Sequence, residues 1–194
     1  MSINISHILD TCVNVPPAIR RAGVIPYTFV NNQIMFCFGV DIPSGDLTDF
    51  GGGRRRNESI LTCANREFME ESLGVFGNYR IYTRKHDYPI IYSPTMMIVL
   101  IPVFPYTEYW NLIFKHTLKQ ICPDTRIEVS DLVWVHWDQM MEYIMGNNNN
   151  IIYKNKSYII YNVVKNFLQG LMEAHPSFNQ HLSQLYLQVF NILI

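Results

Sequence analysis

A run of three glycines, residues 51–53, lies just before a segment that carries a dense cluster of charge. The cluster consists of Arg66, Glu67, Glu70 and Glu71. At about 100° per helical residue, Glu67 and Glu71 stand one turn apart and Glu70 lies beside Glu67. The segment is therefore predicted to be a helix with three carboxylates on one face.

The other side of this helix is apolar. Leu61, Ala64 and Phe68 recur at helical spacing and can pack against a sheet, so the acidic face looks outward. Three neighbouring carboxylates repel one another and raise their own pKa values unless cations join them. Mg²⁺ takes hard oxygen ligands and usually completes its octahedron with substrate phosphate oxygens. The sequence therefore predicts a metal site suited to a diphosphate.

The spacing of these residues resembles the Nudix box, whose pattern is Gly, five residues, Glu, seven residues, Arg-Glu, an apolar residue, any residue, Glu-Glu, any residue, Gly and an apolar residue. This chain supplies the first glycine and every charged position of that pattern, in the order Gly52, Glu58, Arg66, Glu67, Glu70 and Glu71. The closing Gly74 comes one residue later than in the family pattern.

The resemblance implies a role for each acidic residue of the helix. Glu67 and Glu71 would bind a catalytic divalent metal, Mg²⁺ or Mn²⁺, and Glu70 would be a further ligand or the base that activates water. The Gly52 carbonyl could add a backbone ligand. Such a metal lowers the pKa of bound water and orients an in-line displacement. The implied reaction is hydrolysis of a nucleoside diphosphate linked to another group.

Three further residues are expected to support or extend this site. The resemblance implies that Glu58 and Arg66 are structural, with the arginine fixing the rotamers of nearby glutamates. Glu128 precedes residues 130–135, which are similar to the strand that follows the box in many family members. There an acidic residue sometimes serves as a metal ligand or base, so Glu128 is a candidate, although an exposed glutamate at such a junction is usually only solvated.

Arginines are the candidates for binding substrate phosphate. Arg54, Arg55 and Arg56 follow the glycines directly, and Arg21 begins an apolar run earlier in the chain. Guanidinium groups suit bidentate contacts with phosphate. Alternatively, Arg54, Arg55 and Arg56 form a basic loop that is only solvated and binds no phosphate.

Three functions fit these observations. The first is a diphosphatase that acts on a small nucleoside diphosphate derivative. The second is an mRNA decapping enzyme that releases methylated GDP, for which capped RNA would be the partner. The third is a catalytically silent nucleotide-binding module, which the complete set of box carboxylates disfavours.

Composition excludes several other classes. With 48% hydrophobic and 16% charged residues the chain is not disordered, and its net charge of -1 gives no overall preference for nucleic acid or membrane. Four scattered cysteines with no Cys-x-x-Cys pair indicate neither a zinc site nor a disulfide framework. No run approaches the roughly 18 apolar residues that span a bilayer, and no signal peptide is evident. We expect a cytoplasmic protein without a membrane partner.

The pattern of the whole chain predicts an α/β fold, a Nudix-type α/β/α sandwich with a mixed sheet and a C-terminal helical extension. Expected strands are a hairpin over residues 22–30 and 33–40 and further strands over 79–84, 88–92, 95–104 and 130–135, the segment 95–104 being central. Residues 42–49 are expected to be a polar loop, and the acidic helix to span about 58–73.

We expect one domain over residues 1–194, with a core of about 18–172. Residues 105–123 are predicted to be a helical insertion, where Trp110 and Phe114 either stack on a base or form the buried side of the helix. The asparagine run 147–150 is predicted to separate the core from a helical tail. The last helix, within about 173–194, carries an apolar stripe that its own core or a second subunit must cover, so a homodimer is a candidate assembly.

Overall fold

The hairpin predicted around Asn31 and Asn32 lies at the centre of the protein. Strand β2 (Arg21–Val30) pairs antiparallel with β3 (Gln33–Asp41). Both asparagines have positive φ, 50° and 63°, which a two-residue hairpin turn requires and asparagine tolerates. Along both strands, successive side chains point to opposite faces of the sheet and pack into two separate hydrophobic cores.

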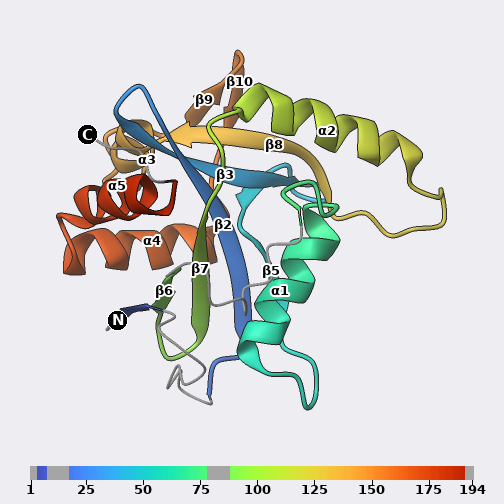
Figure 1. Cartoon of the computed structure of the whole chain (residues 1–194), viewed down its shortest axis with the longest axis horizontal. Coiled ribbons are helices and arrows are strands. Elements are labelled where there is room, and N and C mark those ends of the chain that lie inside the picture. Colours follow the sequence, from blue (N-terminus) through green and yellow to red (C-terminus); the bar gives the residue numbers. More distant parts are fainter. Residues whose placement is uncertain (1–3, 8–17, 78–87, 191–194) are drawn as a thin grey trace.

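The computed structural model describes residues 4–7, 18–77 and 88–190, and its strands form one mixed sheet and one small hairpin (Figure 1). In addition to β2 and β3, the large sheet contains β1 (Asn4–His7), β4 (Leu47–Thr48), β5 (Phe50–Gly53), β6 (Pro89–Tyr92), β7 (Met96–Pro102) and β8 (Val129–His136). Among these described strands, the pairing of β2 with β7 is parallel, and the others pair antiparallel. The predicted mixed sheet is confirmed, with β7 inside it between β6 and β2.

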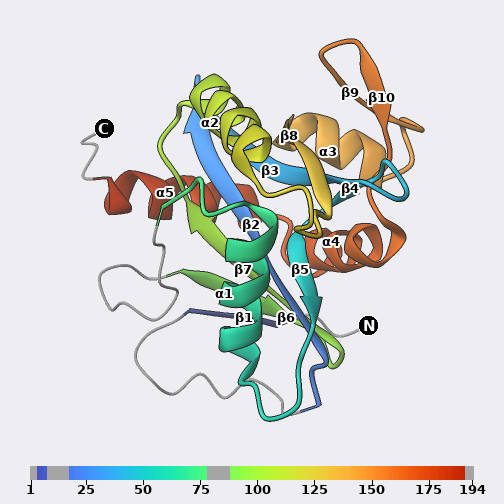
Figure 2. The same ribbon diagram turned by 90° about the vertical axis from the view of Figure 1, so that its right-hand side faces the viewer.

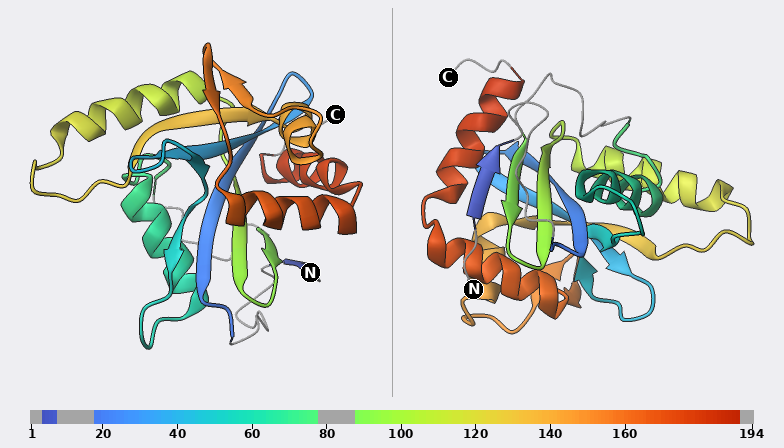
Figure 3. Two further views of the ribbon diagram at one scale, coloured as in Figure 1. Left: turned by 180° about the vertical axis from the view of Figure 1, so that it is seen from behind. Right: turned by 90° about the horizontal axis from the view of Figure 1, so that it is seen from below.

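Helices cover both faces of this sheet, which confirms the predicted α/β/α sandwich. One face carries α1 (Ile60–Glu71) and α2 (Thr107–Gln120), and the other carries α3 (Trp137–Ile144), α4 (Asn162–Ala174) and α5 (Phe178–Val189). Figure 3 shows these two layers from behind and from below. The short hairpin of β9 (Ile151–Tyr153) and β10 (Lys156–Tyr158) projects beyond α3 in Figure 2.

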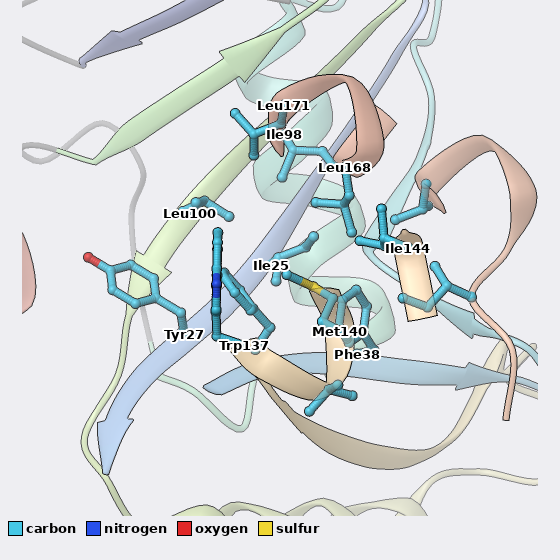
Figure 4. Close-up of a cluster of buried hydrophobic side chains, with 14 of the residues drawn as sticks. Ile25, Tyr27, Phe38, Ile98, Leu100, Trp137, Met140, Ile144, Leu168 and Leu171 are labelled. Atoms are coloured by element: carbon cyan, nitrogen blue, oxygen red, sulfur yellow. The ribbon is translucent and has the colours of Figure 1, made fainter. Parts of the chain in front are cut away.

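Neighbouring residues of each strand point into different cores. On β2, Val24 packs with the side chains of α1, whereas Ile25 packs with those of α3 and α4. Figure 4 shows the second core, where Trp137 and Met140 of α3 meet the sheet residues and Leu168 of α4. Because both faces of the central strands are buried, the strands read as nearly continuous apolar runs.

Part of the apolar side of the C-terminal helix is covered within the same chain. Phe178, Leu182 and Tyr186 of α5 are buried against the sheet, and the Tyr186 hydroxyl donates a hydrogen bond to the Val103 carbonyl at 2.9 Å. The sequence predicts that this helix is covered either by the chain's own core or by a second subunit. For these three residues the chain's own core provides the cover. The homodimer stays a prediction.

Several sequence predictions need correction. Residues 42–49 are not simply a polar loop, because they contain β4, and Leu47 and Asp49 are fully buried. Neither α3 nor the hairpin of β9 and β10 was predicted. The predicted strand 79–84 lies outside the described residues. None of the described helices combines the length and the apolar character that crossing a bilayer requires.

Candidate metal and phosphate site

The predicted acidic helix, α1, begins two residues later than expected. Ser59 is its N-cap, and the Ser59 hydroxyl accepts a hydrogen bond from the Thr62 amide at 3.0 Å. Glu58 is therefore in the preceding turn, where its side chain can reach back toward the helix. The buried side of α1, formed by Cys63, Ala64 and Phe68, packs on the sheet, and α1 lies beside β5 (Figure 2).

The late closing glycine changes how α1 ends. Ser72 is the C-cap, with its amide 3.0 Å from the Phe68 carbonyl. Leu73 and Gly74 then both have positive φ, 55° and 64°. The extra residue thus places a leucine in the left-handed region, which side chains with a Cβ rarely adopt. The acidic residues all precede this irregular turn.

Arg66 is the centre of the charged cluster. Its guanidinium contacts Glu58 through Nε and Oε1 at 2.8 Å, Glu67 at 2.7 Å and Glu70 at 3.2 Å, and it donates to the Gly53 carbonyl at 3.2 Å. The hydrogen bonds from Arg66 lower the pKa of Glu58 to about 2. One arginine therefore joins the glycine turn, the segment before the helix and the acidic face.

The absence of a side chain at Gly52 makes room for Glu67. A Cβ at Gly52 would lie 2.5 Å from Glu67 Oε1, well inside a van der Waals contact. The Gly52 carbonyl also accepts a long contact from the Cys63 thiol at 3.6 Å. The Glu67 carboxylate thus lies against the backbone of Gly52.

Glu71, like Glu67, is half-buried, whereas Glu70 is exposed. The Oε2 of Glu71 accepts a hydrogen bond from the Gly51 amide at 2.8 Å. Burial, together with the negative charges of Asp49, Glu67 and Glu128, raises the pKa of Glu71 to about 8, against the opposing effect of the Gly51 hydrogen bond. The local field here is negative, which is the field a bound cation would neutralise.

Asp49 is the residue of this region that sequence reasoning missed. Its carboxylate is fully buried and accepts two hydrogen bonds from Arg21, at 2.6 and 2.8 Å, and Arg21 also donates to the Gly51 carbonyl at 3.1 Å. Gly23 and Gly51 face each other in register on β2 and β5, and a Cβ at either would meet the carboxylate. The signal in the sequence was weak: Gly51 follows Asp49 by two residues, and Gly23 follows Arg21 by two residues. In this structure the guanidinium of Arg21, a predicted phosphate ligand, is therefore hydrogen-bonded to Asp49.

The other three predicted phosphate ligands, Arg54, Arg55 and Arg56, are exposed in the turn between β5 and α1. Together with residues 18–20 and Asn57 they line an open pocket of about 490 Å³. Arg55 lies 3.5 Å from Glu70. The structure therefore brings these arginines to the edge of the acidic face.

The remaining candidates are Glu128, Trp110 and Phe114. Glu128 is 46% exposed and pairs with Arg126 at 2.9 Å, but it is near enough to raise the pKa of Glu71. Phe114 is fully buried, and Trp110 packs on Phe76 with ring centroids 5.2 Å apart. The predicted helix within residues 105–123 is confirmed as α2, and its Phe114 forms part of the core, whereas its being an insertion stays a prediction.

The donor set fits Mg²⁺ or Mn²⁺ in its chemistry. Carboxylates of Glu67, Glu70 and Glu71 and the Gly52 carbonyl are hard oxygen donors, and a negative, partly buried carboxylate cluster favours a cation. Within residues 4–7, 18–77 and 88–190, no three His, Cys, Asp or Glu side chains are already gathered as a metal site. In this structure the carboxylates of Glu67 and Glu70 contact Arg66, and that of Glu71 accepts the hydrogen bond from Gly51.

Comparison with known proteins gives similarities of structure. No family model and no curated protein matches the sequence. A binary complex of the Ap4A hydrolase of C. elegans has 13% identity and a TM-score of 0.42, covering 82% of this chain and 98% of that one. The Nudix domain of Shewanella oneidensis NrtR, complexed with ADP ribose, has 11% identity and a TM-score of 0.39, covering 83% and 94%. A Nudix hydrolase from Nitrosomonas europaea has 16% identity and a TM-score of 0.36, covering 80% and 71%.

Proposed function

We propose that this chain is a Nudix-type, metal-dependent hydrolase that cleaves the diphosphate linkage of a nucleoside diphosphate derivative. The observation that carries the proposal is the approach of the acidic face of α1 to the glycines of β5. Glu67 fills the space above Gly52, and Glu71 accepts the Gly51 amide hydrogen bond. Backbone and carboxylate oxygens thus meet at one edge, where a metal and a diphosphate could share ligands.

In this proposal Glu67, Glu71 and the Gly52 carbonyl hold the metal, with Glu70 as a further ligand or as the base. When bound, the metal would lower the pKa of a water molecule and neutralise charge on the bridging phosphate oxygens. Glu70 is 52% exposed, so it is the carboxylate best placed to exchange a proton with solvent. Arg66 positions Glu67 and Glu70 without itself touching the substrate.

We also propose that contacts with the sheet hold the Glu71 carboxylate in position. Its hydrogen bond from Gly51 fixes the carboxylate relative to β5, and Arg21, which contacts both Asp49 and the Gly51 carbonyl, fixes β5 relative to β2. The ligands are thereby placed by the sheet as well as by the helix. Such support of a carboxylate by its hydrogen-bond partners is what a metal site depends on. Glu128 would contribute through its negative charge or as an extra ligand.

The test is a mass-spectrometric product assay with Mg²⁺ and then with Mn²⁺. The wild type and the Glu71→Gln variant are offered Ap4A, ADP ribose, other nucleoside diphosphate derivatives and capped RNA. The proposal expects wild type alone to consume a small molecule by cleaving its diphosphate. Circular dichroism of both proteins checks that the variant is folded.

The same assay decides between the proposal and its alternatives. Release of methylated GDP from capped RNA by wild type alone would establish mRNA decapping, which the arginines beside the acidic face also support. No product from either protein, with ligand still bound, would indicate a silent binding module. The proposed location is the cytoplasm, whose reducing conditions suit the free Cys37, Cys63 and Cys122.

A further inference from the structure

We propose that the pocket lined by Arg20, Arg54, Arg55 and Arg56 binds a phosphate group of the substrate that is not hydrolysed. The substrate would then be a small molecule with more phosphate than the diphosphate being cleaved. This inference rests on the proposed function for the identity of the neighbouring reaction, whereas the binding of phosphate in the pocket stands on the pocket alone. We call this pocket, which Ala18, Ile19 and Asn57 also line, the arginine pocket.

Two chain segments are joined to make the arginine pocket. Residue 20 directly precedes β2, and residues 54–56 directly follow β5. β2 and β5 are paired so that Arg21 lies opposite Gly53, and the Arg54 amide donates to the Arg20 carbonyl at 2.8 Å. The sheet therefore places four arginines around one open space of about 490 Å³. Pockets of this size hold small ligands.

The turn that carries three of these arginines is held in place by Glu58. Its Oε2 accepts a hydrogen bond from the Arg55 amide at 2.9 Å, and its carbonyl accepts one from Arg54 Nε at 2.5 Å. Glu58 is itself anchored on α1 by Arg66 at 2.8 Å. The backbone of the turn is thus organised before any ligand arrives, which reduces the entropy lost on binding.

The charge of the arginine pocket is of one sign. Its seven lining residues include four arginines and no carboxylate, while the whole chain has a net charge of -1. Four arginines around one open pocket suit an anion that several of them can share. Phosphate oxygens accept the paired hydrogen bonds that guanidinium donates. A phosphate group is therefore the chemistry that this pocket recognises.

Arg55 connects the pocket to the proposed reaction site. It lines the pocket, and its guanidinium lies 3.5 Å from Oε1 of Glu70 on the acidic face of α1. A phosphate bound in the pocket would thus be a neighbour of the diphosphate held above α1. We favour a small polyphosphorylated molecule over an RNA chain, because the arginines converge on one pocket instead of following a long groove.

The experiment measures binding of inorganic tripolyphosphate by isothermal titration calorimetry in EDTA, where neither metal nor turnover contributes. The test variant is Arg20→Gln with Arg56→Gln, which leaves intact the side-chain contacts of Arg54 and Arg55 that hold the turn. The matched control is Lys119→Gln with Lys156→Gln, which removes the same charge from exposed positions on α2 and β10. Circular dichroism verifies that all the proteins are folded.

We expect the wild type to bind tripolyphosphate, the Arg20→Gln, Arg56→Gln variant to bind at least about tenfold more weakly, and the lysine control to change affinity less than about twofold. Equal weakening in both double variants, or no binding by the wild type, would overturn the inference. So would an arginine-dependent affinity for a 20-nucleotide RNA without any for tripolyphosphate.

The two proposals can fail separately. If Glu71→Gln and wild type are equally inactive but tripolyphosphate binding still depends on Arg20 and Arg56, the pocket stands and the hydrolase proposal fails. If wild type hydrolyses a diphosphate and the Arg20→Gln, Arg56→Gln variant binds tripolyphosphate normally, the hydrolase stands and the pocket inference fails.

Discussion

Arg66 reaches back eight residues to hold Glu58, with Nε 2.8 Å from Oε1 and Nη2 3.1 Å from Oε2. The same guanidinium contacts Glu67 and Glu70, so it joins the turn before α1 to the acidic face of α1. Lysine cannot make these contacts, because it has a single ammonium group instead of a planar fork.

We therefore expect Arg66→Lys to lower the free energy of unfolding by about 1–3 kcal/mol, the range for lost hydrogen bonds between charged groups, and to lower turnover as well. Urea denaturation measures the first effect. Arg126→Lys is the matched control, since Arg126 is 87% exposed and its pair with Glu128 should contribute at most about 1 kcal/mol. Equal stability of the two variants would contradict the role assigned to Arg66.

The pair also predicts a dependence of stability on pH. Because Arg66 lowers the pKa of Glu58 to about 2 from an ordinary value of 4.5, the contribution of Glu58 is complete above pH 4.5 and is lost as the pH falls toward 2. We expect the difference in thermal midpoint between wild type and Glu58→Gln to be constant from pH 7 to 5 and to shrink below pH 4.5. A difference that does not change with pH would remove the ionic explanation.

Gly52 and Gly53 offer a matched pair of substitutions. A Cβ at Gly52 would lie 2.5 Å from Glu67 Oε1, whereas a Cβ at Gly53 has open space around it. We expect Gly52→Ala to displace Glu67 and reduce turnover by about tenfold to a hundredfold, as removal of support for a metal ligand does. Gly53→Ala should keep near wild-type turnover. Steady-state kinetics over a range of Mg²⁺ concentrations measures both, and similar losses in the two variants would argue against Glu67 as a ligand.

The pair between the partly buried Arg21 and the fully buried Asp49 should be costly to break. Asp49 is fully buried, so Asp49→Asn leaves the Arg21 guanidinium without its partner charge. Because the Arg21 side chain is 22% exposed and keeps some access to water, we expect a loss of about 1–3 kcal/mol in the free energy of unfolding. Asp124→Asn, at an exposed position, should cost less than about 0.5 kcal/mol. Chemical denaturation of the two variants side by side provides the measurement.

Local patterns were enough to predict much of the fold. The hairpin turn at Asn31 and Asn32, the apolar run of β7 and the two-sided character of α1 each depend on residues close together in the sequence. Predictions failed where a short element had no boundary signal. α3 follows β8 without a glycine or proline between them, and the turn at Lys154 and Asn155 lacks the glycine that usually marks a hairpin.

The candidate site was predictable only in part for a similar reason. The residues of α1 come from one stretch of sequence, so their common face follows from helical geometry. Asp49 depends on a partner 28 residues away on a different strand. Likewise, no sequence pattern indicated that Arg20 would share a pocket with Arg54, because this requires the register between β2 and β5.

The burial of Asp49 against Arg21 also constrains how this protein can evolve. Replacing Arg21 alone leaves the buried Asp49 carboxylate without its partner, and replacing Asp49 alone leaves a partly buried guanidinium without its carboxylate partner. Replacing both by apolar residues that fill the same space need not destabilise the fold. Gly23 and Gly51 are part of the same constraint, since a side chain at either would occupy the place of the carboxylate. We expect these four positions to be inherited together, and to change together, in any lineage that keeps the sheet.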